Sequence, residues 1–364
     1  MTISLCMIVK NEENNLGNCL SSVEGLFDEI NIIDTGSTDR TVEIAQKYTE
    51  RIFHFDWIND FSAARNFSFS KATKEYIIWL DADDIIDKEN YNKFMEFKRN
   101  FKNDADCIIM PYIIDVQDNG KPSLVSQRER IVRNNKNFYW TRPIHENLKG
   151  QGTVSHFEVF ITHTKKQTDA FIGRNISILE KAVNSSDCEP IDNYYYGVLL
   201  NGTGRHAEAV EQLSLFINNN KNRRLTGIDA FIAIYNSYIA LGDYENAYKV
   251  LALNEEVNKD KSEYYCLMGF FIMNYLQDYD KAAELFKKAL DCTGKEADMI
   301  NCLQRYEQYY YFKPWNFLGQ CYIKKKEYKN ACDAFSEALK YDEDNEELKE
   351  LINKLNEVLA KIDI

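Results

Sequence analysis

Two carboxylates in the first quarter of the chain stand where a metal-assisted reaction would need them. Asp81-Ala-Asp83 directly follows the apolar segment Tyr76-Ile-Ile-Trp-Leu80. Carboxylates at i and i+2 on a turn can face one ligand, and Mg²⁺ or Mn²⁺ takes some oxygen ligands from protein and the rest from substrate phosphates. Such a metal neutralises a departing diphosphate as a Lewis acid. The alternative is a solvated turn with capping aspartates, but the position after an apolar strand favours the metal site.

Two other polar segments follow apolar runs in the same way. Lys10-Asn-Glu-Glu13 follows Ile3–Val9, and Asp34-Thr-Gly-Ser-Thr-Asp39 closes the run that starts at Glu29. Asp34 can accept hydrogen bonds from a base N–H or a ribose hydroxyl, and Gly36 permits close approach of the backbone. Ligands of parallel sheets bind beyond the carboxyl ends of the strands. We therefore expect the three segments to converge on one crevice.

Short apolar runs and helical patterns must position these residues. The first 165 residues contain four apolar runs, separated by helical patterns, at 3–9, 29–34, 51–55 and 76–80. This alternation predicts βαβ units and a parallel sheet. Four further runs without intervening helices predict a mixed, partly antiparallel extension of that sheet, at 107–114, 130–133, 138–140 and 158–163. The polar segment 165–169 is the expected connection to a second domain.

The rest of the chain is helical and repeats a pattern. Its clearest copy has Trp315, Leu318, Gly319 and Tyr322, then Tyr328, Ala331, Phe335 and Ala338. This spacing is typical of the tetratricopeptide repeat, in which small residues stand where two helices cross closely. Weaker copies have their alanine anchors at 209, 247 and 282, and an insertion near 291–312 precedes the last copy. The alternative is an ordinary helical bundle. We expect an α/β domain over 1–168 and a tetratricopeptide-like all-α domain over 169–364.

Composition excludes several classes of protein. The chain has 44 Lys and Arg against 57 Asp and Glu, a formal net charge of −13, which disfavours a nucleic-acid-binding surface. Its nine cysteines are scattered, without metal-site spacing, as expected of buried thiols in a reducing compartment. No apolar run approaches the ~20 residues of a membrane span, and Met1–Val9 resembles a strand more than a signal peptide. We expect a soluble cytoplasmic protein that binds no nucleic acid.

Four motifs together resemble a known family. Met7-Ile-Val-Lys-Asn-Glu-Glu13, Ile33-Asp-Thr-Gly-Ser-Thr-Asp39, Asp60-Phe-Ser-Ala-Ala-Arg-Asn66 and Trp79-Leu-Asp-Ala-Asp-Asp84 occur in the order found in family 2 glycosyltransferases of the GT-A fold. The resemblance covers residues 1 to about 165. With the helical repeats added, the layout is similar to the sublancin-type peptide S-glycosyltransferases. It also resembles relatives of bacterial lipopolysaccharide-core glucosyltransferases, so the acceptor stays open.

The resemblance implies a UDP-sugar donor, UDP-glucose first among them, held with Mg²⁺ or Mn²⁺. Carried onto this chain, it implies that Asn11, Glu12 and Asp34 contact uridine, and that Arg65 holds the base or the diphosphate. Asp81 would then reach the ribose and Asp83 the metal, a role that Asp84 could share. His163 stands where related enzymes carry a late metal-binding histidine, and a purely structural role is its alternative.

The catalytic base is expected in Arg142-Pro-Ile-His145-Glu146. An inverting transfer needs a carboxylate or imidazole within reach of the acceptor, and Glu146 is the favoured base. His145 would have a supporting or metal-ligand role. Their adjacency on a strand points the two side chains to opposite faces, so we expect only one of them to serve as the base. A capped loop with one buried histidine is the alternative. Trp57 and Trp140 could stack on a sugar or an acceptor side chain, or be core residues.

These features predict an inverting hexosyltransferase that acts on a peptide or protein, at Cys or at Ser/Thr. Solenoid surfaces bind extended peptides or partner subunits, so we also expect a homodimer formed through the helical domain. One alternative is a lipopolysaccharide or polysaccharide glucosyltransferase. The other is a non-catalytic scaffold whose first domain only binds nucleotide. Retention of Asp81, Asp83, Arg65 and Glu146 together argues against the scaffold.

Overall fold

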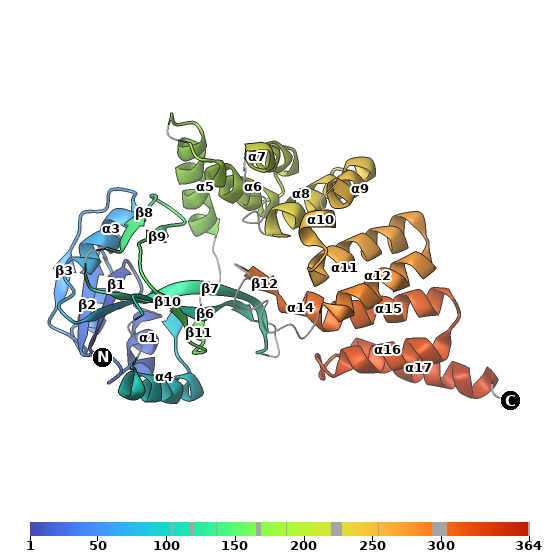
Figure 1. Ribbon diagram of the computed structural model, residues 1–364, viewed down its shortest axis with the longest axis horizontal. Coiled ribbons are helices and arrows are strands. Elements are labelled where there is room, and N and C mark those ends of the chain that lie inside the picture. Colours follow the sequence, from blue (N-terminus) through green and yellow to red (C-terminus); the bar gives the residue numbers. More distant parts are fainter. Residues whose placement is uncertain are drawn as a thin grey trace. The chain divides into compact units, whose positions relative to one another are not determined.

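The protein folds as an α/β unit and an all-α unit (Figure 1). The computed structural model describes residues 1–102, 105–116, 120–135, 137–164, 169–186, 188–219, 228–253, 255–292 and 304–362. The first unit comprises Met1–Asp115 and Val125–Lys181, and the second comprises Val116–Leu124 and Ala182–Ile364. The predicted order of an α/β region and a helical region is confirmed. Most of the expected connection, 165–168, lies outside the described residues.

The strands of the first unit follow the apolar runs of the sequence. They are β1 (Ile3–Val9), β2 (Glu29–Asp34), β3 (Ile52–His54), β4 (Tyr76–Trp79), β5 (Asp84–Ile85), β6 (Cys107–Val116), β7 (Pro122–Arg133), β8 (Tyr139–Thr141), β9 (Asn147–Lys149), β10 (Val154–His156) and β11 (Ile161–His163). The sheet order is β3-β2-β1-β4-β7-β6-β11-β5, β10 pairs with β6, and β8 and β9 form a separate hairpin.

The sheet is parallel at one side and mixed at the other, as predicted. β1 pairs in parallel with β2 and β4, and β2 pairs in parallel with β3. The antiparallel partner of β4 is β7, and β5 is antiparallel to β11. The parallel strands β1, β2 and β4 thus end at the same edge, where their polar segments follow.

Helices cover both faces of this sheet, because alternate side chains of a strand point to opposite faces. The helices of this unit are α1 (Leu16–Ser22), α2 (Thr41–Ala45), α3 (Phe61–Phe69) and α4 (Lys88–Asn100). Leu5 and Met7 of β1 pack in one core with Leu20 of α1 and Phe94 of α4. Cys6, between them in the sequence, packs in the opposite core, which also includes side chains of α3, β4 and β8. Figure 1 shows α1 and α4 together, and α3 beside the β8–β9 hairpin.

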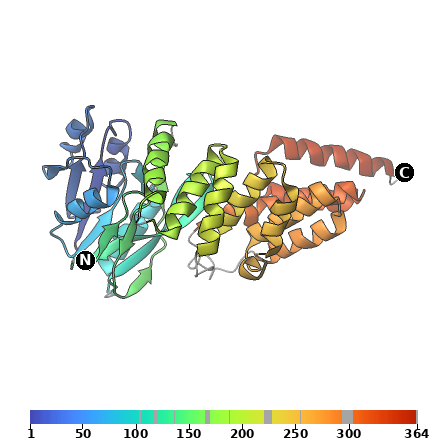
Figure 2. The ribbon, with the colours of Figure 1, turned by 90° about the horizontal axis from the view of Figure 1, so that it is seen from above.

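The second unit is a series of helices that pack on their sequence neighbours (Figure 2). Helix α5 (Asp169–Val183) precedes the series and belongs to the first unit as far as Lys181. The series includes α6 (Pro190–Gly202), α7 (His206–Asn219), α8 (Ile228–Ala240), α9 (Tyr244–Leu253), α10 (Glu255–Asn258), α11 (Ser262–Phe271), the π-helix η1 (Ile272–Leu276), α12 (Tyr279–Asp291), α14 (Glu307–Tyr310), α15 (Phe312–Lys324), α16 (Tyr328–Leu339) and α17 (Glu346–Ile362). The short strand β12 (Gln304–Tyr306) precedes α14. Most of the predicted insertion, 293–303, lies outside the described residues.

The spacing of glycines explains the repeat. A Cβ on Gly319 of α15 would lie 2.6 Å from Phe335 of α16, and one on Gly197 of α6 would lie 2.6 Å from Leu213 of α7. A Cβ on Gly269 of α11 would likewise lie 2.7 Å from Phe286 of α12. Each glycine therefore lets a large side chain of the following helix approach the helix backbone. Paired helices with this crossing confirm the tetratricopeptide-like interpretation.

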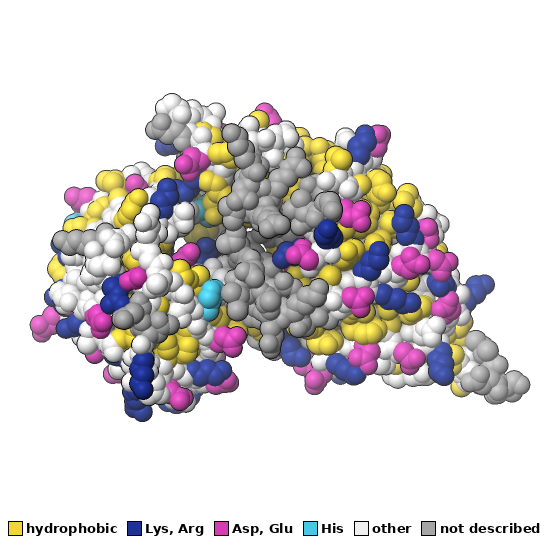
Figure 3. Space-filling model, viewed as in Figure 1, with side chains coloured by type: hydrophobic (Ala, Val, Ile, Leu, Met, Phe, Trp, Pro, Cys, Tyr) yellow, Lys and Arg dark blue, Asp and Glu magenta, His cyan; other side chains and the backbone are white. Residues whose placement is uncertain are grey.

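Three further features concern the surface charges, the cysteines and the apolar character of the helices. Figure 3 shows acidic and basic side chains mixed with hydrophobic ones over the face of the helical unit that it presents. The eight cysteines among the described residues form no disulfide bond with one another. Within the described ranges, no helix is both long enough and apolar enough to cross a membrane.

Candidate active site

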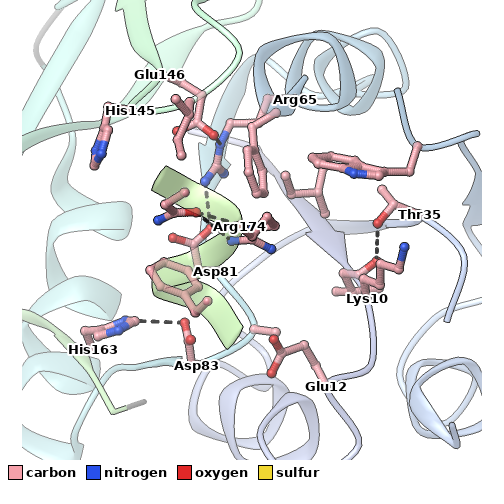
Figure 4. A pocket seen from close by; sticks show the side chains of 18 residues that line it. Lys10, Glu12, Thr35, Arg65, Asp81, Asp83, His145, Glu146, His163 and Arg174 are labelled. Atoms are coloured by element: carbon pink, nitrogen blue, oxygen red, sulfur yellow. Dashed lines mark hydrogen bonds and ion pairs between the residues drawn. The ribbon is translucent and has the colours of Figure 1, made fainter. Parts of the chain in front are cut away.

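A cavity of about 520 Å³ opens at the carboxyl ends of β1, β2 and β4 (Figure 4). Its polar lining residues are Lys10, Glu12, Thr35, Arg65, Asp81, Asp83, His145, Glu146, His163, Arg174 and Asn175. The strand ends are held side by side, because Val9 is paired with Asp34 and the Thr35 N–H donates to the Val9 carbonyl at 2.9 Å. The structure thus brings the three predicted polar segments to one site.

Asn11 and Asp34 are not among the residues that line this cavity. The Asp34 carboxylate accepts hydrogen bonds from the backbone N–H groups of Ser37, at 3.1 Å, and Gly36, at 3.3 Å. Asn11 Oδ1 accepts from the Thr38 N–H at 2.8 Å. Gly36 has φ +97°, a backbone conformation that residues with a side chain rarely adopt. Both residues therefore build the loop after β2, while Glu12 lines the cavity itself.

Arg65 of α3 is the central cation of the site. Its guanidinium lies over the rings of Trp79 and Trp140, at 4.7 and 5.1 Å from their centroids. Arg65 Nη2 donates to Asp81 Oδ1 at 2.8 Å, and Arg65 Nε lies 3.8 Å from Glu146 Oε1. Burial alone would lower the pKa of Arg65, but the charges of Asp81 and Glu146 outweigh it and raise that pKa. Arg65 is therefore fixed in place as a permanent positive charge.

Trp140 supports Arg65 and does not face a ligand. Its side chain is only 5% exposed and packs edge-on against Trp79, with ring centroids 5.1 Å apart. The interpretation of Trp140 as a core residue is therefore correct. Trp57, by contrast, lines the cavity next to Phe61, with ring centroids 4.7 Å apart.

Asp83, Asp84 and His163 form a group with the spacing of metal ligands. His163 Nδ1 lies 3.3 Å from Asp83 Oδ1 and 3.8 Å from Asp84 Oδ1. No hydrogen bond of ordinary geometry reaches the buried Asp83 Oδ1 within the described part of the chain. A carboxylate and an imidazole are ligands that Mn²⁺ accepts. The residues therefore fit a divalent cation, with Asp83 as the carboxylate that lies open to it.

Asp84, a member of that group, also accepts several buried hydrogen bonds. Arg130 Nη1 donates to Asp84 Oδ2 at 3.2 Å, and the Tyr112 hydroxyl donates to Asp84 Oδ1 at 2.8 Å. The Asp81 N–H donates to Asp84 Oδ2 at 3.0 Å. Arg130 lies between the rings of Trp79 and Tyr112, 3.9 and 4.2 Å from their centroids, and is fully buried. Asp84 thus holds the shape of the turn, and Arg130 compensates its charge.

His145 and Glu146 lie in the loop between β8 and β9, not on a strand as expected. Arg142 and His145 have φ of +83° and +49°, left-handed conformations that interrupt the strand. The Phe61 N–H of α3 donates to the Pro143 carbonyl at 2.9 Å and fixes the loop against that helix. The expectation of opposite strand faces is therefore wrong, and both side chains line the cavity (Figure 4).

Burial shifts the pKa values of the two candidate bases in opposite directions. It raises the pKa of the Glu146 carboxyl, although the charge of Arg65 acts in the opposite direction. Burial, with the charges of Arg128 and Arg142, lowers the pKa of His145 to about 4. A carboxylate with a raised pKa is the stronger proton acceptor of the two, because general bases work best when their pKa is close to the working pH.

The structure adds one helix to the site that sequence reasoning missed. Helix α5 contributes Phe171, Arg174 and Asn175 to the cavity wall. These residues follow no strand and belong to no motif that the sequence analysis singled out. In the sequence they fall on a helix of the expected repeat domain, and the charge pattern of that helix does not indicate that they reach the cavity.

Comparison with models of known protein families identifies a domain within the first unit. Residues 4–162 match the family model described as "Glycosyl transferase family 2". The first unit contains a glycosyl transferase family 2 domain. Residues 312–345 match the model for the tetratricopeptide repeat. The family 2 domain with its mixed sheet, and the helical pairs that follow, confirm the predicted GT-A-like and tetratricopeptide-like architecture.

Several curated proteins share parts of this layout. The "SPbeta prophage-derived glycosyltransferase SunS" of Bacillus subtilis is 30% identical over 258 residues, which cover 67% of this chain and 60% of SunS. A TPR repeat-containing protein of Synechococcus elongatus is 35% identical over 144 residues, 40% of this chain and 34% of that protein. The "Lipopolysaccharide core biosynthesis glycosyltransferase LpsC" of Rhizobium meliloti is 27% identical over 170 residues, 43% of this chain and 60% of LpsC. The chain therefore spans about three fifths or less of these relatives.

Proposed function

We propose that the protein is an inverting glycosyltransferase that moves a hexose from a UDP-sugar, UDP-glucose first among them, to a peptide or protein. The observation that carries the proposal is one cavity that unites Asp81, Asp83 and His163 with the Arg65–Glu146 pair. The family 2 domain supports the donor class. The resemblance to sublancin-type peptide S-glycosyltransferases and the attached repeats support a peptide acceptor.

The residues divide the work as follows. Glu146 accepts the proton of the acceptor thiol or hydroxyl as that atom attacks the anomeric carbon. The bond from that carbon to the diphosphate breaks, its electron pair stays with the phosphate oxygen, and an α-linked donor yields a β-linked product. Asp81 orients the donor ribose, and Glu12 contacts the uridine. A divalent cation held by Asp83 and His163 would supply positive charge to the leaving diphosphate when bound.

Asp83→Asn tests the metal assignment. We expect this change to lower Mn²⁺-dependent hydrolysis of UDP-glucose by about 100-fold or more, because an amide is a far weaker ligand than a carboxylate. Binding of Mn²⁺ alone, measured by titration calorimetry, should weaken in parallel. Glu89→Gln, which removes an exposed carboxylate of α4, is the matched control and should retain both properties. Unchanged Mn²⁺ binding by the Asp83 variant would remove the metal assignment.

Donor and acceptor classes are separated by two assays. A thermal-shift screen of UDP-, GDP- and dTDP-sugars with Mn²⁺ should show the largest stabilisation with UDP-sugars. Mass spectrometry should then detect a hexose on peptides that contain Cys, Ser or Thr. Transfer only to a lipid-linked saccharide would favour the polysaccharide alternative, to which the similarity with LpsC points. Binding without transfer or hydrolysis would favour the scaffold.

Self-association through the helical unit is part of the proposal. Large apolar side chains are exposed on α9, on η1 and in the turn after α8, with Tyr244 46%, Leu276 58% and Leu241 50% exposed. The Tyr244 and Tyr275 rings lie 4.5 Å apart and extend this surface. We expect light scattering of the full chain to report twice the mass of one chain. A Tyr244→Glu variant should then shift toward the monomer, and a single-chain mass for the unmodified protein would contradict the dimer.

A further inference from the structure

Helix α5 belongs to the donor site. Its residues up to Lys181 group with the first unit, and Phe171, Arg174 and Asn175 line the cavity. Figure 4 shows Arg174 among the side chains that line the cavity. The expected boundary at residue 169 would have assigned all three side chains to the repeat domain. The position of Arg174 therefore calls for a function in the cavity.

Two aromatic rings and one amide oxygen contact the guanidinium of Arg174. It lies 5.1 Å from the ring centroid of Phe61 and 4.9 Å from that of Phe171. Arg174 Nε and Nη2 donate to Asn175 Oδ1 at 3.3 and 3.2 Å. A guanidinium carries five N–H donors, so these two bonds leave three donors available. No carboxylate among the described residues forms an ion pair with it, although the charge of Glu146 acts on it.

Arg65 differs in this respect, because carboxylates already compensate its charge. It is paired with Asp81 at 2.8 Å and approaches Glu146 at 3.8 Å. Its side chain is 8% exposed, whereas the Arg174 side chain reaches the cavity from an exposed helix face. The resemblance gave Arg65 the base or the diphosphate, but the geometry makes Arg65 the partner of Asp81 and Glu146.

The charge balance of the cavity creates the need for another cation. Its lining includes four carboxylates, Glu12, Asp81, Asp83 and Glu146, against Lys10, Arg65 and Arg174, with the imidazoles of His145 and His163 beside them. A diphosphate that enters this cavity adds further negative charge. Planar guanidinium groups bind phosphate oxygens with two parallel hydrogen bonds, which a lysine cannot do. Arg174 meets this requirement better than Lys10.

We propose that Arg174 binds the diphosphate of the nucleotide-sugar donor and holds it as the bond to the sugar breaks. The electron pair of that bond passes to the phosphate oxygen, which would accept hydrogen bonds from the remaining Arg174 donors. Charge that develops on the leaving group is then stabilised by a fixed donor in a partly enclosed site. This inference rests on the proposed function, since it names the group that α5 contributes to the same reaction.

Titration calorimetry with UDP and with uridine, both in the presence of MnCl₂, tests the inference. We expect Arg174→Gln to weaken UDP binding by about 10- to 100-fold, because a hydrogen bond to a charged group contributes about 1.5–3 kcal/mol and each 1.4 kcal/mol is tenfold. Uridine, which lacks phosphate, should bind the variant as it binds the unmodified protein. Arg174→Lys should recover only part of the UDP affinity, because it restores the charge without the planar fork.

Lys181→Gln supplies the matched control, because it removes a positive charge from the same helix outside the cavity. It should bind UDP as the unmodified chain does. UDP binding by Arg174→Gln at the unmodified affinity would overturn this inference alone, as would an equal loss for UDP and uridine. A rise in the acceptor KM at unchanged UDP affinity would also overturn it. Absence of UDP binding by the unmodified protein would overturn the proposed function together with the inference.

Discussion

Glu146→Gln should lower kcat for sugar transfer by about 10²- to 10⁴-fold, the usual contribution of a general base, while UDP binding stays close to that of the unmodified protein. Glutamine has the shape of glutamate but cannot accept the acceptor's proton. The comparison of kcat with calorimetric UDP affinity separates loss of the base from damage to the donor site. His145→Gln is the matched variant, since both side chains line the cavity from one loop. A larger loss of kcat in His145→Gln would transfer the role of base to the histidine.

The pH profile provides an independent check on the same residue. Burial raises the pKa of the Glu146 carboxyl above its ordinary value of 4.5. As the pH falls through this raised pKa, the carboxylate gains a proton and can no longer act as a base. The rate of the unmodified enzyme should therefore decrease on acidification at a pH above 4.5. The residual rate of Glu146→Gln should lack this step, and an unchanged step in the variant would contradict the assignment.

Arg130→Met should lower the free energy of unfolding by about 3–5 kcal/mol, the cost of leaving one partner of a buried ion pair alone. Arg130 and Asp84 are both fully buried, and their side chains lie 3.2 Å apart. Methionine can fill part of the space between the Trp79 and Tyr112 rings but cannot compensate the charge of Asp84. Urea unfolding of the full chain, followed by the signal of the first unit, measures the loss.

Two further variants test whether the loss of stability comes from breaking the buried Arg130–Asp84 pair. Arg133→Met removes an arginine from the same strand whose ion pair is only partly buried, since the Arg133 side chain is 24% exposed and that of its partner Asp106 is 25% exposed. That change should cost about 1 kcal/mol or less. Combining Arg130→Met with Asp84→Asn removes both charges, so the double variant should be more stable than Arg130→Met alone. A double variant that is less stable than Arg130→Met would contradict the pairing argument.

Local patterns were sufficient to predict the elements that hold the site. Runs such as Ile3–Val9 alternate between two cores, and that alternation is a property of any buried strand. Asp83 could be proposed from the sequence because it comes directly after a strand, at the edge where the carboxyl ends gather. The repeat was visible because Gly319 and Ala331 mark helix crossings, where size limits the choice of residue. In each case the constraint acts between residues that are close in sequence or follow a fixed period.

The parts that were missed depend on contacts between distant segments. The loop with His145 and Glu146 adopts left-handed conformations and is fixed by α3, which no strand pattern can indicate. Arg130 looks like an ordinary strand arginine until the fold buries it against Asp84, 46 residues earlier in the chain. Asn66 is a similar case, because its side chain exchanges two hydrogen bonds with the backbone of Trp140. Only the tertiary structure gives these side chains their partners.

The continuity of α5 determines how this protein can be divided and recombined. A truncated chain that stops near residue 170, the border suggested by the sequence patterns, would lose one wall of the donor cavity with its arginine. Its inactivity would then be mistaken for a dependence of catalysis on the repeats. Chimeras that exchange repeat units between relatives should therefore be joined after Lys181, in the segment Asn184–Ser186 between α5 and α6. Such a junction exchanges the repeats and keeps every residue that lines the cavity in the chain.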